Sequence, residues 1–149
     1  MAKAWVVVAN STTARIFLAE TPMGPLLELK TLCRPESRLR EQDLVTDAPG
    51  SAADSGGPGK HAVEVRDGAK WHEAIRFAEE LAAELETGRQ QGKYHSLCLM
   101  AEPAFLGVLR ERLSAGTTAL VRTAVNKNLT RHNPQEIRQA LPDRLFSTL

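Results

Sequence analysis

A short apolar run at residues 4–9 places the strongest constraint on the fold of this chain. The run contains three successive valines and ends at the polar pair Asn10-Ser11. Because it is apolar at every position rather than at every second one, it predicts a strand that is buried on both faces. A second run of this kind occupies residues 97–101. Strands of this type lie in sheets that helices cover on both sides, so the two runs predict an α/β fold.

Two further strands are predicted before residue 34. Residues 14–19 alternate between two faces, and the four-residue polar loop before them suits a hairpin with residues 4–9. Residues 27–33 are expected to form the third strand of an antiparallel meander. That strand is expected to turn four side chains to one face: Leu27, Leu29, Thr31 and Cys33.

The second half of the chain changes to helical spacing. Between residues 70 and 86, apolar residues that begin with Trp71 recur every three to four positions, and Gly88 and Gly92 mark the predicted end of the helix. The remaining predicted elements are a helix at 103–115, the strand at 97–101 before it, a strand at 120–125, and a helix at 134–141 with Pro134 at its first position.

This order of elements predicts one domain over residues 1–149. Right-handed crossovers place the later strands beside the first and parallel to it. The expected fold is an α/β, ribonuclease H-like mixed sheet of about five strands, three antiparallel and then two parallel, with helices packed on it. No apolar run approaches the roughly 18–20 residues that span a bilayer, and the start lacks a signal peptide, so we expect a cytoplasmic protein.

Residues 34–69 show neither a long helical period nor a strand pattern, apart from 62–65. Four glycines fall between residues 50 and 59, which makes this the most flexible part of the sequence. Connections longer than about 12–15 residues in compact domains are usually functional or disordered. We therefore expect a long glycine-rich loop at 34–69.

Motifs for metal-dependent catalysis are not evident. A two-metal nuclease needs several converging carboxylates, but residues 4–9 and 97–101 carry none, and Glu102 follows only after the second run. His61 lies in the expected loop, and His72 lacks the second histidine four residues later that a helical zinc motif requires. We expect no metal site, no cofactor and no catalytic residues of this kind.

Polar residues follow the strands where α/β proteins commonly bind ligands, at the carboxyl ends of the parallel strands. There the sequence places Asn10, Ser11 and Lys127 as candidate binding residues, although asparagines also suit turns. The formal net charge is only +1, but residues 103–149 hold seven basic and three acidic residues. This excess could contact phosphates, and an ordinary solvated surface explains it equally well.

Several segments resemble the bacterial family called host attachment proteins. They are Arg34-Pro35-Glu36-Ser37-Arg38-Leu39, Asp43-Leu44-Val45-Thr46-Asp47-Ala48-Pro49-Gly50, Asp54-Ser55-Gly56 and Gly59-Lys60-His61, with Trp5-Val6-Val7-Val8-Ala9-Asn10-Ser11 and Lys127-Asn128-Leu129-Thr130 near the two ends. The family is thought to be similar to the middle domain of archaeo-eukaryotic peptide-chain release factors, which has a ribonuclease H-like arrangement. The resemblance implies a binding segment made of Arg34, Pro35, Glu36, Ser37, Arg38, Asp43, Asp47, Gly50, Asp54, Ser55, Gly56, Gly57, Lys60 and His61.

The chain departs from the release factors at one motif. Their Gly-Gly-Gln loop helps water release the peptide, but here Pro58 follows Gly56-Gly57 and no glutamine lies between residues 43 and 89. The resemblance therefore implies a non-catalytic module that binds the ribosome, ribosomal RNA or a related assembly, rather than an enzyme. Two alternatives stay open: a protein-interaction factor that affects attachment to host cells indirectly, and an esterase-type hydrolase acting on peptidyl-tRNA through His61 or the loop backbone.

Overall fold

The computed structural model describes residues 2–34 and 59–147, with side chains from Gly68 onward in the second range. Three strands come first along these residues, and helices and strands follow, as the sequence predicts. In chain order they are β1 (Ala4–Ala9), β2 (Thr13–Ala19), β3 (Leu27–Cys33), α3 (Gly59–Gln90), β4 (Ser96–Ala101), α4 (Pro103–Arg112), α5 (Ala115–Ala119), β5 (Val121–Val125) and α6 (Pro134–Gln139).

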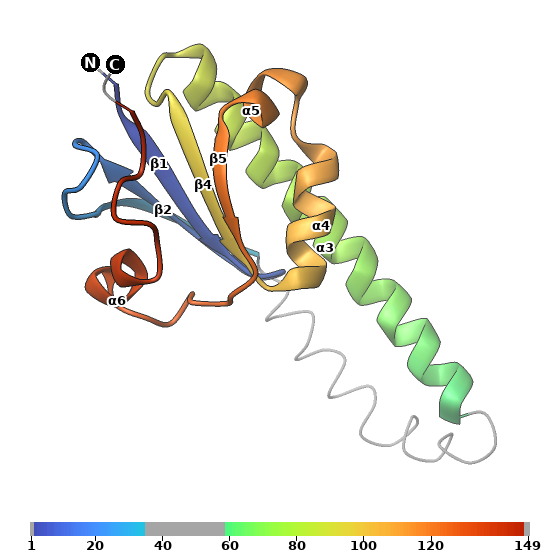
Figure 1. The fold of residues 1–149 in the computed structure, drawn as a ribbon. Helices are drawn as coiled ribbons and strands as arrows, with labels where there is room; N and C mark the ends of the chain where they lie inside the picture. Colours follow the sequence, from blue (N-terminus) through green and yellow to red (C-terminus); the bar gives the residue numbers. More distant parts are fainter. Residues whose placement is uncertain (1, 35–58, 148–149) are drawn as a thin grey trace.

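The strands form one mixed sheet in the order β3-β2-β1-β4-β5 (Figure 1). Strand β2 pairs antiparallel with both β1 and β3, whereas β4 runs parallel to β1 and β5 runs parallel to β4. Three antiparallel strands followed by two parallel ones is the predicted arrangement, so the α/β, ribonuclease H-like sheet is confirmed.

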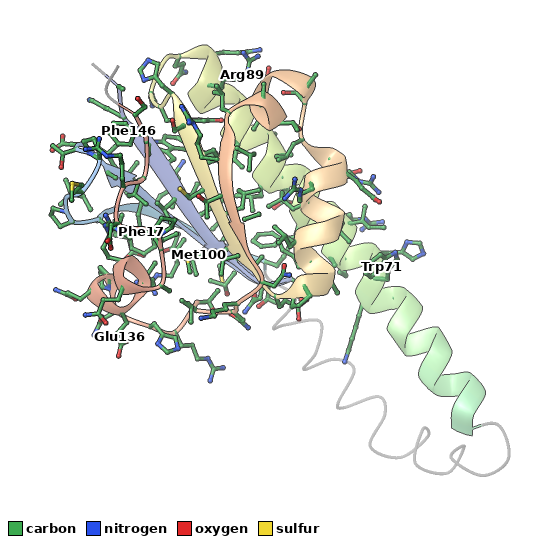
Figure 2. All side chains as sticks on the ribbon, viewed as in Figure 1. Phe17, Trp71, Arg89, Met100, Glu136 and Phe146 are labelled. Carbon is green, nitrogen blue, oxygen red and sulfur yellow. The ribbon has the colours of Figure 1, made fainter. Side chains whose placement is uncertain are left out.

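The two apolar runs lie at the centre of the sheet, and every residue of β1 and β4 is buried. Successive side chains of a strand point to opposite faces, so β1 contributes to two cores. Val7 packs in the core under α3 and α4, and Val6 packs in the core under α6 and the C-terminal segment. Figure 1 shows these helices on opposite faces of the sheet, and Figure 2 labels Phe17, Met100 and Phe146 of the second core.

Helix α3 is longer than the sequence predicts. It begins at Gly59 rather than at residue 70, so the expected loop at 34–69 was wrong for its last eleven residues; residues 35–58 of that loop lie outside the described residues. A helix that is already formed extends at little cost, and one interior glycine such as Gly68 costs only about 1 kcal/mol. Figure 1 shows that the first turns of α3 project beyond the sheet and α4.

Trp5 closes the other end of α3, at the amino ends of β1 and β4. Its indole is 5% exposed and stacks on Tyr94 with ring centroids 4.8 Å apart. Gly88 was predicted to mark the helix end, but it lies inside α3 against this indole. A Cβ at Gly88 would lie 2.6 Å from Trp5 Cη2, so the close approach requires glycine. Gly92 is the residue that ends the helix, because it has a φ of +71°.

A polar cluster ties the same end of α3 to the short helix α5. The carboxylate of Glu86 accepts hydrogen bonds from Arg89 (2.7 Å from Nη2), from Ser114 Oγ (2.7 Å) and from Thr117 Oγ1 (3.0 Å). These donors, with Arg89 first, lower the pKa of Glu86 to about 2. Ser114 also caps α5. The helix predicted at 103–115 therefore ends at Arg112, and α5 follows it as a separate helix that the sequence did not predict.

The edge strand β3 departs from simple alternation. Its register against β2 shifts between Ile16 and Phe17, so that Lys30 pairs with Ile16 and Glu28 pairs with Phe17. The shift leaves Leu29 as an extra residue, and a bulge of this kind reverses the faces of the residues before it. The single face expected for the four side chains of this strand is therefore wrong.

Candidate functional site

The carboxyl ends of β1 and β4 meet at one edge of the sheet, which we call the carboxyl edge. Ala9 and Ala101 are paired at the last position of the two strands. Ser11 follows β1, and Glu102 follows β4 as the N-cap of α4, where its Oε1 accepts a hydrogen bond of 3.2 Å from the Phe105 amide. Parallel pairing therefore brings Ser11 and Glu102 to the same place although they are distant in the sequence.

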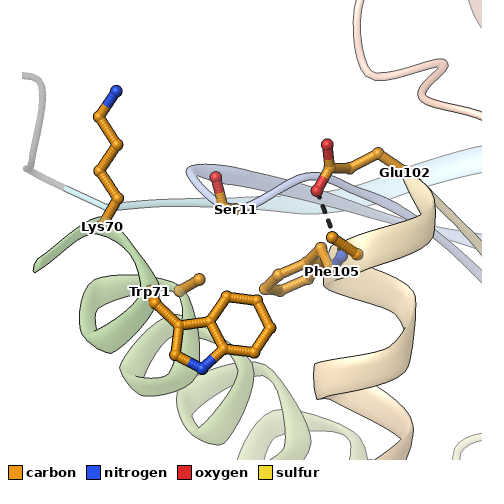
Figure 3. Close-up of a pocket in the computed structure, with 7 residues that line it drawn as sticks. Ser11, Lys70, Trp71, Glu102 and Phe105 are labelled. Carbon is orange, nitrogen blue, oxygen red and sulfur yellow. Dashed lines mark hydrogen bonds between the residues drawn. The ribbon is translucent and has the colours of Figure 1, made fainter. Parts of the chain in front are cut away.

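A pocket of about 160 Å³ opens at this edge between the strand ends and α3 (Figure 3). Helix α3 supplies one wall of the pocket, and the first turn of α4 supplies the opposite wall. The lining residues are Ser11, Lys70, Trp71, Ala74, Glu102, Ala104 and Phe105. In Figure 3 the polar ends of Lys70, Ser11 and Glu102 point to one side, above the two aromatic rings.

Trp71 differs from its sequence-based prediction. The helical spacing placed it on the apolar face of α3, but its side chain is 48% exposed in the pocket wall. The reason is that α3 extends past the sheet, so the position at Trp71 has no strand beneath it to complete the core. Phe105 opposite is buried and packs on Phe77 with ring centroids 5.8 Å apart. The pocket thus combines a fixed aromatic wall with an exposed one.

The described lining residues supply groups that can bind a ligand. A serine nucleophile needs an adjacent base, and none of the described lining residues is a histidine. Glu102 is the one carboxylate among the described lining residues, and one of its oxygens already caps α4. Among residues 2–34 and 68–147, no group of three histidine, cysteine, aspartate or glutamate side chains could hold a metal ion.

The other two residues of the predicted rim lie outside the pocket. Asn10 Oδ1 accepts hydrogen bonds of 2.8 Å from the amides of Thr12 and Thr13, and its Nδ2 donates to Thr130 Oγ1 at 3.2 Å. Asn10 therefore holds the turn after β1 and the loop after β5 together. Lys127 is exposed just beyond the end of β5, at the same edge of the sheet.

Arg34, the first residue of the predicted binding segment, forms ion pairs with α3. Its guanidinium donates to Glu80 Oε2 at 2.7 Å and to Glu73 Oε1, and the side chain is mostly buried. This arrangement fixes the end of β3 to the helix. Lys60 and His61 lie in the first turn of α3, where the side chains are not described. The remaining candidates lie outside the described residues: Pro35, Glu36, Ser37, Arg38, Asp43, Asp47, Gly50, Asp54, Ser55, Gly56 and Gly57.

The basic residues of 103–149 do not share one surface. Arg112 lies on α4 and pairs with Glu79 at 3.7 Å, whereas Arg138 lies on α6, across the sheet, and donates to three backbone carbonyls. Lys127 and Arg131 are both exposed. Arg131 lies near the carboxyl edge, because the preceding residue, Thr130, accepts a hydrogen bond from Asn10 after β1. Lys127 lies near the same edge, just beyond the end of β5. Neither of these two, nor Lys70, forms an ion pair with a described residue.

No helix in the described part of the chain is both long enough and apolar enough to cross a membrane.

Comparisons with known proteins give a family match over most of the chain and similarities to individual proteins. A family model described as "Protein required for attachment to host cells" matches residues 5–141. An uncharacterized protein of Rickettsia prowazekii (strain Madrid E), RP470, is 34% identical over 55 residues, which are 37% of this chain and 37% of RP470.

One solved structure, the archaeal translation termination factor aRF1, aligns with a TM-score of 0.43 and 12% identity over 95% of this chain and 35% of that one. This chain therefore spans little more than a third of the length of either relative. The match over residues 5–141 shows the family: the chain belongs to the family of proteins required for attachment to host cells.

Proposed function

We propose that this chain is a non-catalytic, release-factor-like binding module that acts in the cytoplasm and docks on ribosomal RNA through its carboxyl edge. The observation that carries the proposal is the joint display of Trp71 and Lys70 at the mouth of the pocket. Proteins that bind single-stranded nucleic acid combine exposed aromatic rings, which stack on bases, with nearby cations, which attract phosphates.

The charge around the pocket supports an anionic partner. Lys70, Lys127 and Arg131 lie at or near the carboxyl edge, and none is paired with a described acidic residue. Glu102 is the one acid among the described residues of the pocket lining. Phosphate contacts of this kind give affinity without sequence specificity.

Ribosome co-sedimentation tests the proposal across a salt series. With about three phosphate contacts, the logarithm of the affinity should fall with that of the salt concentration at a slope of about −2. The substitution Lys127→Ala should reduce the slope by about 0.7, and Lys93→Ala, an exposed lysine at the other end of α3, should leave it unchanged. Failure of ribosomes and of ribosomal RNA to bind at low salt would reject the proposal.

A second candidate function is a protein-interaction factor that affects attachment to host cells indirectly. It is favoured by exposed apolar side chains on and beside the edge strand β3, where Leu27 is 49%, Leu29 47% and Met23 63% exposed. An open strand edge can pair with a strand of another protein. This candidate predicts a protein partner that binds the wild type and the Trp71→Ala variant but does not bind the Leu29→Ser variant. None of these three proteins should bind RNA.

A further inference from the structure

We infer that the pocket at the carboxyl edge holds one unstacked nucleobase that carries a phosphate. The base lies along the Trp71 indole, an amino group on the base donates to the Glu102 carboxylate, and the phosphate meets Lys70. This inference rests on the proposed function and deepens it, because it names the part of an RNA strand that the site recognises.

The size and walls of the pocket suit a flat ring. Its volume of about 160 Å³ is more room than one water molecule or one ion needs. Phe105 is held by Phe77, and Ala74 and Ala104 leave the space beside it open. Aromatic side chains gain affinity by stacking on bases, and every base has a face that can stack.

The polar groups select among the bases. Glu102 is the carboxylate of the lining, and its Oε1 is occupied by the Phe105 amide at 3.2 Å, which fixes the orientation of the group. A carboxylate accepts hydrogen bonds and cannot donate them, so it favours bases with exocyclic amino groups, as acidic side chains do with cytosine. Uracil has no exocyclic amino group, and its ring N3–H lies between two carbonyl oxygens that repel a carboxylate. Adenine, cytosine and guanine should therefore bind more tightly than uracil.

The cations at the carboxyl edge argue against a positively charged ligand. An aromatic wall beside a carboxylate could also hold an ammonium group by a cation–π contact. Lys70 in the pocket lining and Lys127 at the same edge disfavour a second cation here and favour a phosphate. The site therefore fits a nucleotide better than a basic peptide.

Tryptophan fluorescence provides the test, because Trp71 is exposed and Trp5 is buried against Tyr94. AMP, CMP, GMP and UMP are titrated alone, and single-stranded oligonucleotides of each base are titrated separately. The two arms distinguish a site for free nucleotides from a site for RNA strands. The quench should saturate, should be weakest for uracil, and should disappear in Trp71→Phe while binding measured by anisotropy of labelled RNA persists.

Variants separate stacking from selection. Trp71→Ala should weaken binding of the amino-bearing ligands about tenfold or more, whereas Met23→Ala, a truncation of another exposed apolar side chain, should not. Glu102→Gln should reduce the preference against uracil. Circular dichroism confirms that each variant is folded.

The outcomes are distinct. Equal binding of RNA by wild type and Trp71→Ala would overturn the inference and leave the proposed function standing. Saturable, Trp71-dependent binding of nucleotides without binding of ribosomes or RNA would support the pocket and reject the proposed function. No binding of nucleotides or RNA would overturn both.

Discussion

Helix α3 meets the rest of the molecule at two ends that are built differently. At its C-terminal end Trp5 is buried, stacks on Tyr94 and touches the backbone at Gly88. At its N-terminal side Trp71 faces an open pocket with nearly half of its surface exposed. The same residue type therefore completes a core at one end and remains accessible at the other.

This difference separates stability from recognition along one helix. The closed end satisfies its polar groups internally, as the hydrogen bonds to Glu86 and the bond from Tyr94 Oη to the Leu85 carbonyl (2.7 Å) show. The open end presents Lys70, Trp71 and Ser11 to solvent. Substitutions at the closed end should change the free energy of unfolding without changing binding, and substitutions at the open end should do the reverse.

The largest effect is expected for Trp5→Ala. Removing a buried tryptophan deletes its packing against Tyr94 and Gly88 and should lower the free energy of unfolding by about 3–5 kcal/mol. Urea denaturation measures this loss. A loss below about 1 kcal/mol would show that the closed end does not depend on the indole.

Gly88→Ala should be destabilising although alanine is the better helix former. The added Cβ would lie 2.6 Å from Trp5 Cη2, and overpacking of this kind costs about 1–3 kcal/mol, more than the gain of about 1 kcal/mol in helix propensity.

The matched control is Gly107→Ala in α4, where a Cβ would meet nothing within 4 Å. That variant should be more stable than wild type by about 0.5–1 kcal/mol. If both variants were stabilised alike, the close contact at Gly88 would be refuted.

A smaller effect on the free energy of unfolding is expected when Glu86, at the closed end, is protonated at low pH. Because the pKa of Glu86 falls from the ordinary 4.5 to about 2 on folding, its contribution is fully present above pH 4.5 and is lost as the pH approaches 2. Wild type should therefore lose more free energy of unfolding than Glu86→Gln between pH 5 and pH 2.5 (roughly the span of that titration).

Urea denaturation at a series of pH values measures the difference. Glu111→Gln, at an exposed position of α4 with no hydrogen bond to a described residue, serves as the control and should follow wild type. Parallel curves for wild type and Glu86→Gln would contradict the assigned hydrogen bonds.

The smallest effect on stability is expected for Trp71→Ala. An exposed side chain outside the core usually changes the free energy of unfolding by no more than about 0.5 kcal/mol. Thermal unfolding of this variant should therefore match wild type while its nucleotide binding is weakened. A loss comparable to that of Trp5→Ala would mean that both ends of α3 are core.

The sheet was predictable because its two central strands stand out in the sequence as uninterrupted apolar runs. Residues 4–9 and 97–101 are apolar at every position, and only a strand between two helical layers buries both faces. The cap at Asn133-Pro134 was also predictable, since Asn133 accepts from the Glu136 amide in a local motif. The shift that leaves Leu29 unpaired was not, because a one-residue bulge depends on the pairing with β2.

The site was predictable only where it follows from strand order. Ser11 comes two residues after β1 and Glu102 comes directly after β4, so their proximity follows from parallel pairing. Lys70 and Trp71 were missed because their place depends on how far α3 runs past the sheet. The helical period of the sequence gives the face of Trp71 but not whether a strand lies beneath it.

The length of α3 has a geometric consequence. At 1.5 Å per residue its 32 residues span about 48 Å, whereas the six residues of β4 span about 20 Å. Gly59 therefore lies about 16 Å along the helix axis from Lys70. The helix fixes both this distance and the direction around the axis at which the chain enters. One inserted residue between them would turn the chain entering at Gly59 by about 100°, whereas four would leave it only about 40° from its original direction.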